Sequence, residues 1–158
     1  MSRALLRQRG QELLEFAIVL PILLLVILGA LATANAVSSD TQINQAAARA
    51  ALDASNANTT HCADAFTAAQ TAIQEVVTSN IITVDAITVD CNAGDHGNHA
   101  TCFGTETGSP NSDCSSAAFE PGNLLTVVVD THVSVALFGT GPSLPLSSTG
   151  ASVIPPTP

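Results

Sequence analysis

The pattern of hydrophobic and polar positions is dominated by one long apolar run near the N-terminus. No charged residue occurs from Phe16 to Ala34, and the run ends near Ala36. A helix that crosses a bilayer needs about 20 mostly apolar residues. The run therefore predicts a membrane-spanning helix over residues 11–36. Pro21 lies inside it and predicts a kink, because proline removes one helical hydrogen bond.

Apolar positions recur at helical spacing in two later stretches, residues 41–54 and residues 61–79. For the first stretch two interpretations are open: Asp40 caps a separate helix, or the membrane helix continues without a break. In the second stretch, Asp64 falls in the first turn, where the helix dipole favours an acidic side chain. The shared faces consist of Ile43, Ala47, Ala50 and Ala54 in the first stretch and of Phe66, Ala69, Ile73, Val76 and Val77 in the second.

Two further stretches predict β-strands. Ile81–Asp90 is rich in β-branched residues. Leu124–Phe138 alternates strictly between apolar and polar residues, which is typical of a strand with one buried face. Between them, Asn92–Asn123 predicts a long loop. The inward positions are Ile82, Val84, Ile87 and Val89 in the first strand and Leu125, Val127, Val129, Thr131, Val133, Val135 and Leu137 in the second.

The basic and acidic residues are very unevenly distributed along the chain. Three of the four arginines precede Gly10, only Arg49 follows it, and all but two of the 13 acidic residues come after the apolar run. Arginines beside a membrane helix stay in the cytoplasm, so this distribution predicts a cytoplasmic N-terminus and an external remainder. It also excludes a nucleic-acid partner, which would require basic contacts to phosphate. Since the chain has no lysine, Schiff-base and Walker-type chemistry are excluded as well.

The four cysteines, Cys62, Cys91, Cys102 and Cys114, all fall in the part predicted to lie outside the membrane. An even number of cysteines in an oxidising compartment predicts two disulfides, for which three pairings exist. Four free thiols and a metal site are the alternative interpretations.

One group of residues has the composition of a metal site, but its spacing argues against one. It comprises Asp90, Cys91, Asp95, His96, His99 and Cys102. His96 and His99 are three residues apart, which differs from the helical zinc motif, and the glycines around them favour a loop. No catalytic, phosphate-binding or dinucleotide-binding motif occurs. The sequence therefore predicts no metal, no cofactor and no enzymatic activity.

The N-terminus differs from an ordinary secretory signal peptide. Such a signal has a basic start, an apolar core of about 7–15 residues and a small-residue cleavage site, for which Ala32-Thr33-Ala34 would qualify. Here the apolar core is too long, and Glu12 and Glu15 stand between the arginines and that core.

The order of residues resembles instead a class III prepilin signal, and residues 9–54 are similar to the TadE-like family. These proteins are minor pseudopilins of the tight-adherence (Tad) pilus, a type IVc system. The resemblance rests on Arg9-Gly10, Glu15-Phe16, Leu20-Pro21-Ile22 and the stretch Gln45–Ala51, which is rich in alanine and contains one arginine.

The resemblance implies a role for several of these residues. A prepilin peptidase would cut between Gly10 and Gln11, where glycine offers no side chain to obstruct a narrow active site. Glu15 would then meet the new N-terminal amine of a neighbouring subunit during assembly, with Phe16 beside it. A snorkelling Glu15 is the alternative interpretation. The implied partners are the peptidase, other pilins and pseudopilins, Tad inner-membrane assembly proteins and the lipid bilayer.

The expected fold class is α+β: a long transmembrane, pilin-like helix, followed by a small disulfide-stapled extracytoplasmic domain with a second helix and an antiparallel sheet. The expected segments are a basic leader (1–10), a membrane helix (11–36), the domain (37–138) and a tail rich in proline and serine (139–158), with an optional short strand at 151–154. The expected function is structural, in assembly of or adhesion by a Tad-type pilus at the bacterial inner membrane. The alternatives are an uncleaved component of the same machinery and an anchored binding domain that uses His96 and His99.

Overall fold

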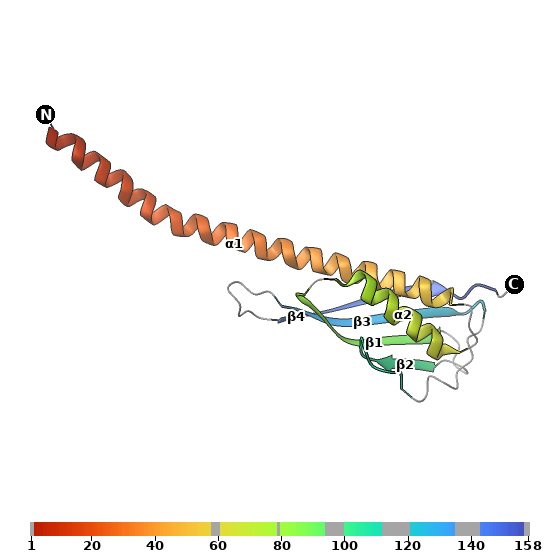
Figure 1. The fold of residues 1–158 in the computed structure, drawn as a ribbon. Helices are drawn as coiled ribbons and strands as arrows, with labels where there is room; N and C mark the ends of the chain where they lie inside the picture. Colours follow the sequence, from red (N-terminus) through yellow and green to blue (C-terminus); the bar gives the residue numbers. More distant parts are fainter. Residues whose placement is uncertain are drawn as a thin grey trace. The chain divides into compact units, whose positions relative to one another are not determined.

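The computed structural model of the chain (Figure 1) describes residues 2–57, 61–78, 80–93, 100–111, 121–134 and 143–156, with the backbone alone at 2–14, 92–93 and 100. It forms two compact units, residues 1–36 and 37–158. The antiparallel sheet has the strand order β2-β1-β3-β4. The elements are α1 (Ser2–Ser55), α2 (Cys62–Val76), β1 (Ile82–Ala93), β2 (Ala100–Gly104), β3 (Leu124–Ser134) and β4 (Ser143–Val153). The predicted α+β class is confirmed.

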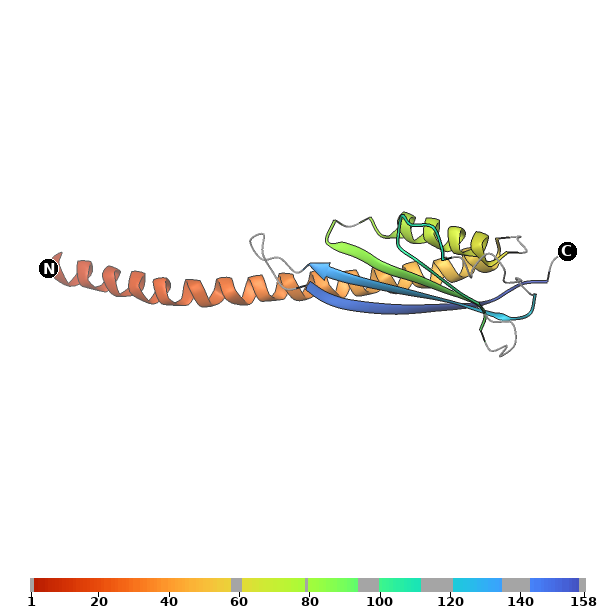
Figure 2. The same cartoon turned by 90° about the horizontal axis from the view of Figure 1, so that it is seen from below.

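The second unit is a two-layer structure in which α2 and the last part of α1 cover one face of the sheet (Figures 1 and 2). Alternate residues of β3 are buried, and the residues between them are partly exposed. The larger of two core clusters joins both helices to this inner face, and the smaller one consists of Ile43, Ile82 and Val133. Its largest fully buried members are Phe66, Ile73, Ile87, Leu125, Ile154, Val89, Val127 and Val129.

Helix α1 continues without a break through Asp40 to Ser55, so the second of the two open interpretations of residues 41–54 holds. The predicted shared face is confirmed, because Ile43, Ala47, Ala50 and Ala54 are all buried. In α2, Phe66, Ala69 and Ile73 of the predicted stripe are buried as well. The helical period therefore located both covering helices correctly.

A β-bulge in β1 explains an irregularity in its apolar pattern. Val84 and Ile87 are three residues apart, yet both side chains are buried in the core. The pairing with β3 shifts register between Val84 and Ala86, which inserts one extra residue and restores the alternation beyond it. The bulge leaves Asp85 exposed on the outer face of the sheet.

The loop predicted over Asn92–Asn123 is interrupted by the short strand β2, so this prediction is wrong at residues 100–104. The strand is held by contacts from α2. A Cβ atom added at Gly104 would lie 2.7 Å from Cζ of Phe66, which shows how closely the ring covers the strand. Gln70 Nε2 also donates hydrogen bonds to the carbonyl oxygens of Thr105 (2.9 Å) and Gly108 (3.1 Å). Contacts with these distant residues hold β2 in place. The strand was missed because its five residues show too little alternation of apolar and polar positions to predict it.

The segment expected as a tail contributes the eleven-residue strand β4, which pairs with β3 along its whole length. Its two buried residues, Ser148 and Gly150, are small because α1 lies directly on them. A Cβ atom at Gly150 would fall 2.0 Å from the carbonyl oxygen of Ala47. On one side of this contact, Ser148 Oγ donates to Asn44 Oδ1 (2.6 Å). The short strand considered at 151–154 is thus part of a much longer one.

Both edges of the sheet carry a feature that limits pairing with another strand. At the β2 edge, the Asn111 N–H donates to Phe103 O (3.0 Å), and the Asn111 Oδ1 accepts from the Phe103 N–H (2.9 Å). Figure 2 shows β4 along the other margin. The backbone N–H groups of its even-numbered residues point to β3, as the 2.9 Å hydrogen bond from Ile154 N–H to Asn123 O indicates. At the odd-numbered position 145 an N–H would point to the open edge, and Pro145 has none. Proline at this edge therefore discourages pairing with another strand.

The contact between α1 and β4 should make Gly150→Ala strongly destabilising. The added methyl group would overlap the backbone of α1, so the helix must move away from the sheet. We expect the free energy of unfolding to fall by at least about 1–3 kcal/mol. Urea unfolding of the detergent-solubilised chain, followed by far-UV circular dichroism, measures this change.

Gly29→Ala is the matched control, because a Cβ atom at Gly29 meets no atom within 4 Å. It should leave the unfolding midpoint of the second unit unchanged. Equal midpoints for the Gly150 variant and the wild type would contradict the close packing of α1 on β4.

Candidate functional sites

The first part of α1 presents a continuous apolar surface that nothing in the described part of the chain covers. Within the described residues, one helix, beginning at Glu15, is long and apolar enough to span a membrane. Its large side chains are exposed from Phe16 (64%) to Val37 (63%). Burying each such side chain is worth about 1.5–3 kcal/mol, so this surface requires lipid or other helices around it.

The residues predicted to act in processing and assembly all lie on this helix. Gly10 and Gln11 are within the helical backbone of α1, and their side chains lie outside the description. Glu15 and Phe16 are exposed. Gln11 and Glu15 are four residues apart in a helix, which places them on the same helix face. Their predicted roles in cleavage and assembly remain predictions.

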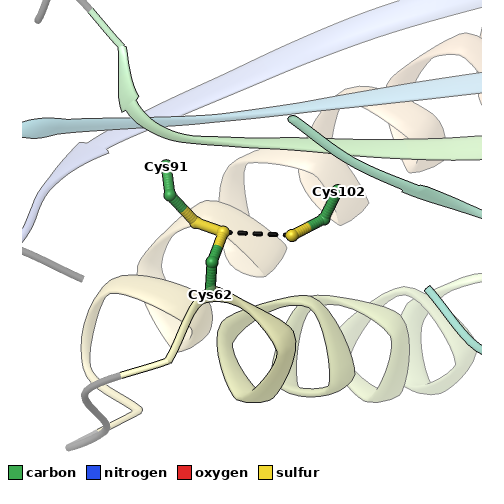
Figure 3. Close-up of side chains that lie close together, drawn as sticks. All are labelled: Cys62, Cys91 and Cys102. Atoms are coloured by element: carbon green, nitrogen blue, oxygen red, sulfur yellow. Dashed lines mark hydrogen bonds between the residues drawn. A yellow bond between two sulfur atoms is a disulfide. The ribbon is translucent and has the colours of Figure 1, made fainter. Parts of the chain in front are cut away.

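A second site is formed by three buried sulfur atoms (Figure 3). Cys62 is the first residue of α2, Cys91 lies on β1 and Cys102 lies on β2. Cys62 and Cys91 form a disulfide with a Cα–Cα distance of 6.2 Å. Cys102 Sγ lies 3.1 Å from Cys62 Sγ, and all three side chains are fully buried. The predicted disulfide chemistry is thus confirmed for Cys62 and Cys91.

The three sulfur atoms lie within 4.8 Å of one another, which is compatible with a shared metal ion only if they are thiolates. In this structure Cys102 is disulfide-bonded as well, and none of the described cysteines is free. Two members of the metal-ligand group considered from the sequence, Cys91 and Cys102, are therefore committed to disulfides. His96, His99, Asp95 and Cys114 lie outside the described residues.

Two polar contacts that the sequence did not reveal connect neighbouring elements: a hydrogen bond between His132 and Asp85, and an ion pair between Arg49 and Glu75. His132 Nδ1 on β3 lies 2.7 Å from Asp85 Oδ1 in the β1 bulge. Arg49 on α1 lies 3.6 Å from Glu75 on α2 and 3.7 Å from Asp53. All of these side chains are more than a third exposed, so each pair contributes little stability. Thr83 is paired in register with His132, and Asp85 lies two residues further along β1, so the first pair depends on strand pairing and no local motif indicates it.

Comparison with known proteins relates the N-terminal part of the chain to a described family. Residues 10–52 match the family model described as TadE-like protein. No curated protein and no solved structure matches the chain. The matched range begins at the predicted cleavage site and ends in the part of α1 that packs on the sheet. The family resemblance of the N-terminal third is therefore confirmed.

Removing the disulfide in the double variant Cys62→Ala/Cys91→Ala should destabilise the second unit. The cysteines are 29 residues apart, and loop-closure entropy for that length predicts a loss of about 3–4 kcal/mol. Urea unfolding under non-reducing conditions measures it. The control pair Ser147→Ala/Thr149→Ala changes two exposed β4 side chains and should stay within about 0.5 kcal/mol of wild type. A double cysteine variant as stable as this control would contradict a stabilising role for the disulfide.

Proposed function

We propose that this chain, whose residues 10–52 belong to the TadE-like family, is a minor pseudopilin of a Tad-type, type IVc pilus. The observation that carries the proposal is the extent of the match. It covers one helix that includes the predicted cleavage site, the exposed apolar surface and the face buried against the sheet. A single element would therefore carry processing, membrane insertion and attachment of the external domain.

In this proposal α1 anchors the chain in the bacterial inner membrane, with the N-terminus in the cytoplasm. Support comes from the exposed apolar side chains of α1, which have no cover in the described part of the chain. The three arginines before Gly10 favour the cytoplasmic side. The Cys62–Cys91 disulfide suits an oxidising compartment for the second unit.

A prepilin peptidase would remove the leader by cutting between Gly10 and Gln11. The amine of Gln11 would then lie one helical turn from Glu15, at the mouth of the apolar surface. A carboxylate at this depth is costly unless it is paired. In an assembly, Glu15 would pair with the N-terminal amine of a neighbouring copy or of another pilin subunit, and the surface beginning at Phe16 would pack on neighbouring helices.

Two other functions fit parts of the same structure. An uncleaved membrane component of the Tad machinery would share the helix and the domain but retain residues 1–10. An anchored external binding domain would use the segment with His96 and His99, which lies outside the described residues. N-terminal sequencing of the membrane-extracted protein distinguishes the first of these from the pseudopilin.

Gly10→Leu should block removal of the leader, because the added side chain obstructs the position before the cut. Cells that contain the peptidase should accumulate chain with Met1-Ser2-Arg3 still attached, measured by intact mass. The same substitution at Gly29, where no atom lies within 4 Å, should leave cleavage normal. A wild-type mature chain that keeps its leader would exclude the pseudopilin and favour the uncleaved component.

Glu15→Gln should leave cleavage intact but lower incorporation into sheared surface pili by roughly tenfold, which corresponds to about 1.4 kcal/mol. The substitution removes the charge and preserves the size of the side chain, so only pairing with an amine is lost. Quantitative immunoblotting of the sheared fraction measures incorporation. Asp40→Asn, at another exposed carboxylate of α1, is the control and should behave as wild type. Normal incorporation of the Glu15 variant would refute the assembly role.

A further inference from the structure

We propose that Cys62, Cys91 and Cys102 form a thiol–disulfide exchange site, in which Cys62 pairs with either of the other two cysteines. The present pairing is Cys62–Cys91, and the third sulfur lies 3.1 Å from Cys62 Sγ (Figure 3). The Cys62 sulfur is therefore bonded to one partner and lies in direct contact with the sulfur of the other. This site is independent of the proposed role in a pilus.

Cys62 is the common member because of where the other two cysteines lie in the sheet. Cys102 is paired in register with Val89, so Cys91, two residues further along β1, is its diagonal neighbour. Both side chains face the core. Diagonal neighbours are about 7–8 Å apart, which is beyond the usual Cα–Cα distance of a disulfide. Cys62, at the start of α2, reaches both strands from the helix layer.

The exchange begins when a dithiol reduces the disulfide that Cys102 makes and is itself oxidised to a disulfide. The Cys102 thiolate then attacks Cys62 Sγ. A Cys62–Cys102 bond forms, the Cys62–Cys91 bond breaks, and the electron pair goes to Cys91 Sγ, which takes up a proton and becomes a thiol. The exchange itself conserves the number of disulfides.

The consequence for the fold is a change in the attachment of α2. With Cys62–Cys91 the first residue of α2 is tied to β1, and with Cys62–Cys102 it is tied to the edge strand β2. Because the two strands are neighbours and all three sulfur atoms lie within 4.8 Å, either pairing keeps α2 on the same face of the sheet.

The test uses the full detergent-solubilised chain and dithiothreitol in graded ratios of its reduced and oxidised forms. Acid quenching, alkylation of thiols, proteolysis and mass spectrometry then identify the disulfides. Molecules with one remaining disulfide should contain Cys62–Cys102 and Cys62–Cys91 in amounts within about tenfold of each other, because the Cys62 sulfur lies beside both partner sulfur atoms. One-disulfide molecules that contain Cys62–Cys91 alone, or loss of all disulfides in a single step, would overturn the proposal.

Two variants test which cysteine is shared. In Cys91→Ser, under the same dithiothreitol ratios, the molecules with one disulfide should include Cys62–Cys102, formed once the disulfide that Cys102 makes has been reduced. In Cys62→Ser, a Cys91–Cys102 bond should be at least about tenfold rarer. Equal yields of the two bonds would contradict the assignment of Cys62 as the common sulfur. If either variant fails to fold, the titration of the wild-type chain still decides the proposal.

Discussion

The second unit depends on the direct approach of helix α1 to strand β4. Ala47 and Gly150 meet backbone to backbone, with no room for a Cβ atom on the strand. This approach requires small residues on both surfaces, which explains the buried alanines of α1 and the small inward residues of β4. A core with few large side chains buries less apolar area for its size, and here a disulfide from α2 to β1 adds a covalent restraint. Close helix packing and covalent restraint therefore act together.

The same requirement explains which elements the sequence predicted. In α2 and β3 the apolar period agrees with the buried face, so both were found, and Phe66 and Val129 are buried as predicted. The predicted inward residues Val135 and Leu137 lie outside the described residues. In β4 the buried positions include Ser148 and Gly150, which a periodicity argument assigns to solvent or to a turn. The strand was missed because its inward side is defined by α1, about a hundred residues away in the chain.

The two candidate sites also differ in whether a local sequence pattern is enough to predict them. Gly10 and Glu15 belong to a local pattern that the family match also covers, so the sequence alone is enough to predict their roles, which stay predictions. The four cysteines predicted disulfides, but the sequence could not show that Cys102 lies beside Cys62. It follows from the register of β2 against β1 and from the docking of α2, which are non-local features.

The surfaces of the described part of the chain leave one favourable region for association. Asn111 occupies the β2 edge, and Pro145 interrupts the donors of the β4 edge, so strand addition is opposed at both margins. Beyond Gly10 the only cation is Arg49, which already lies between Asp53 and Glu75. Two copies of this acidic unit would repel each other at long range. The exposed apolar surface of α1 carries no such penalty, and its burial is the largest favourable term that these residues offer to a lipid or protein neighbour. Association through the apolar surface of α1, rather than through the second unit, is therefore the arrangement that the energetics of this chain favour.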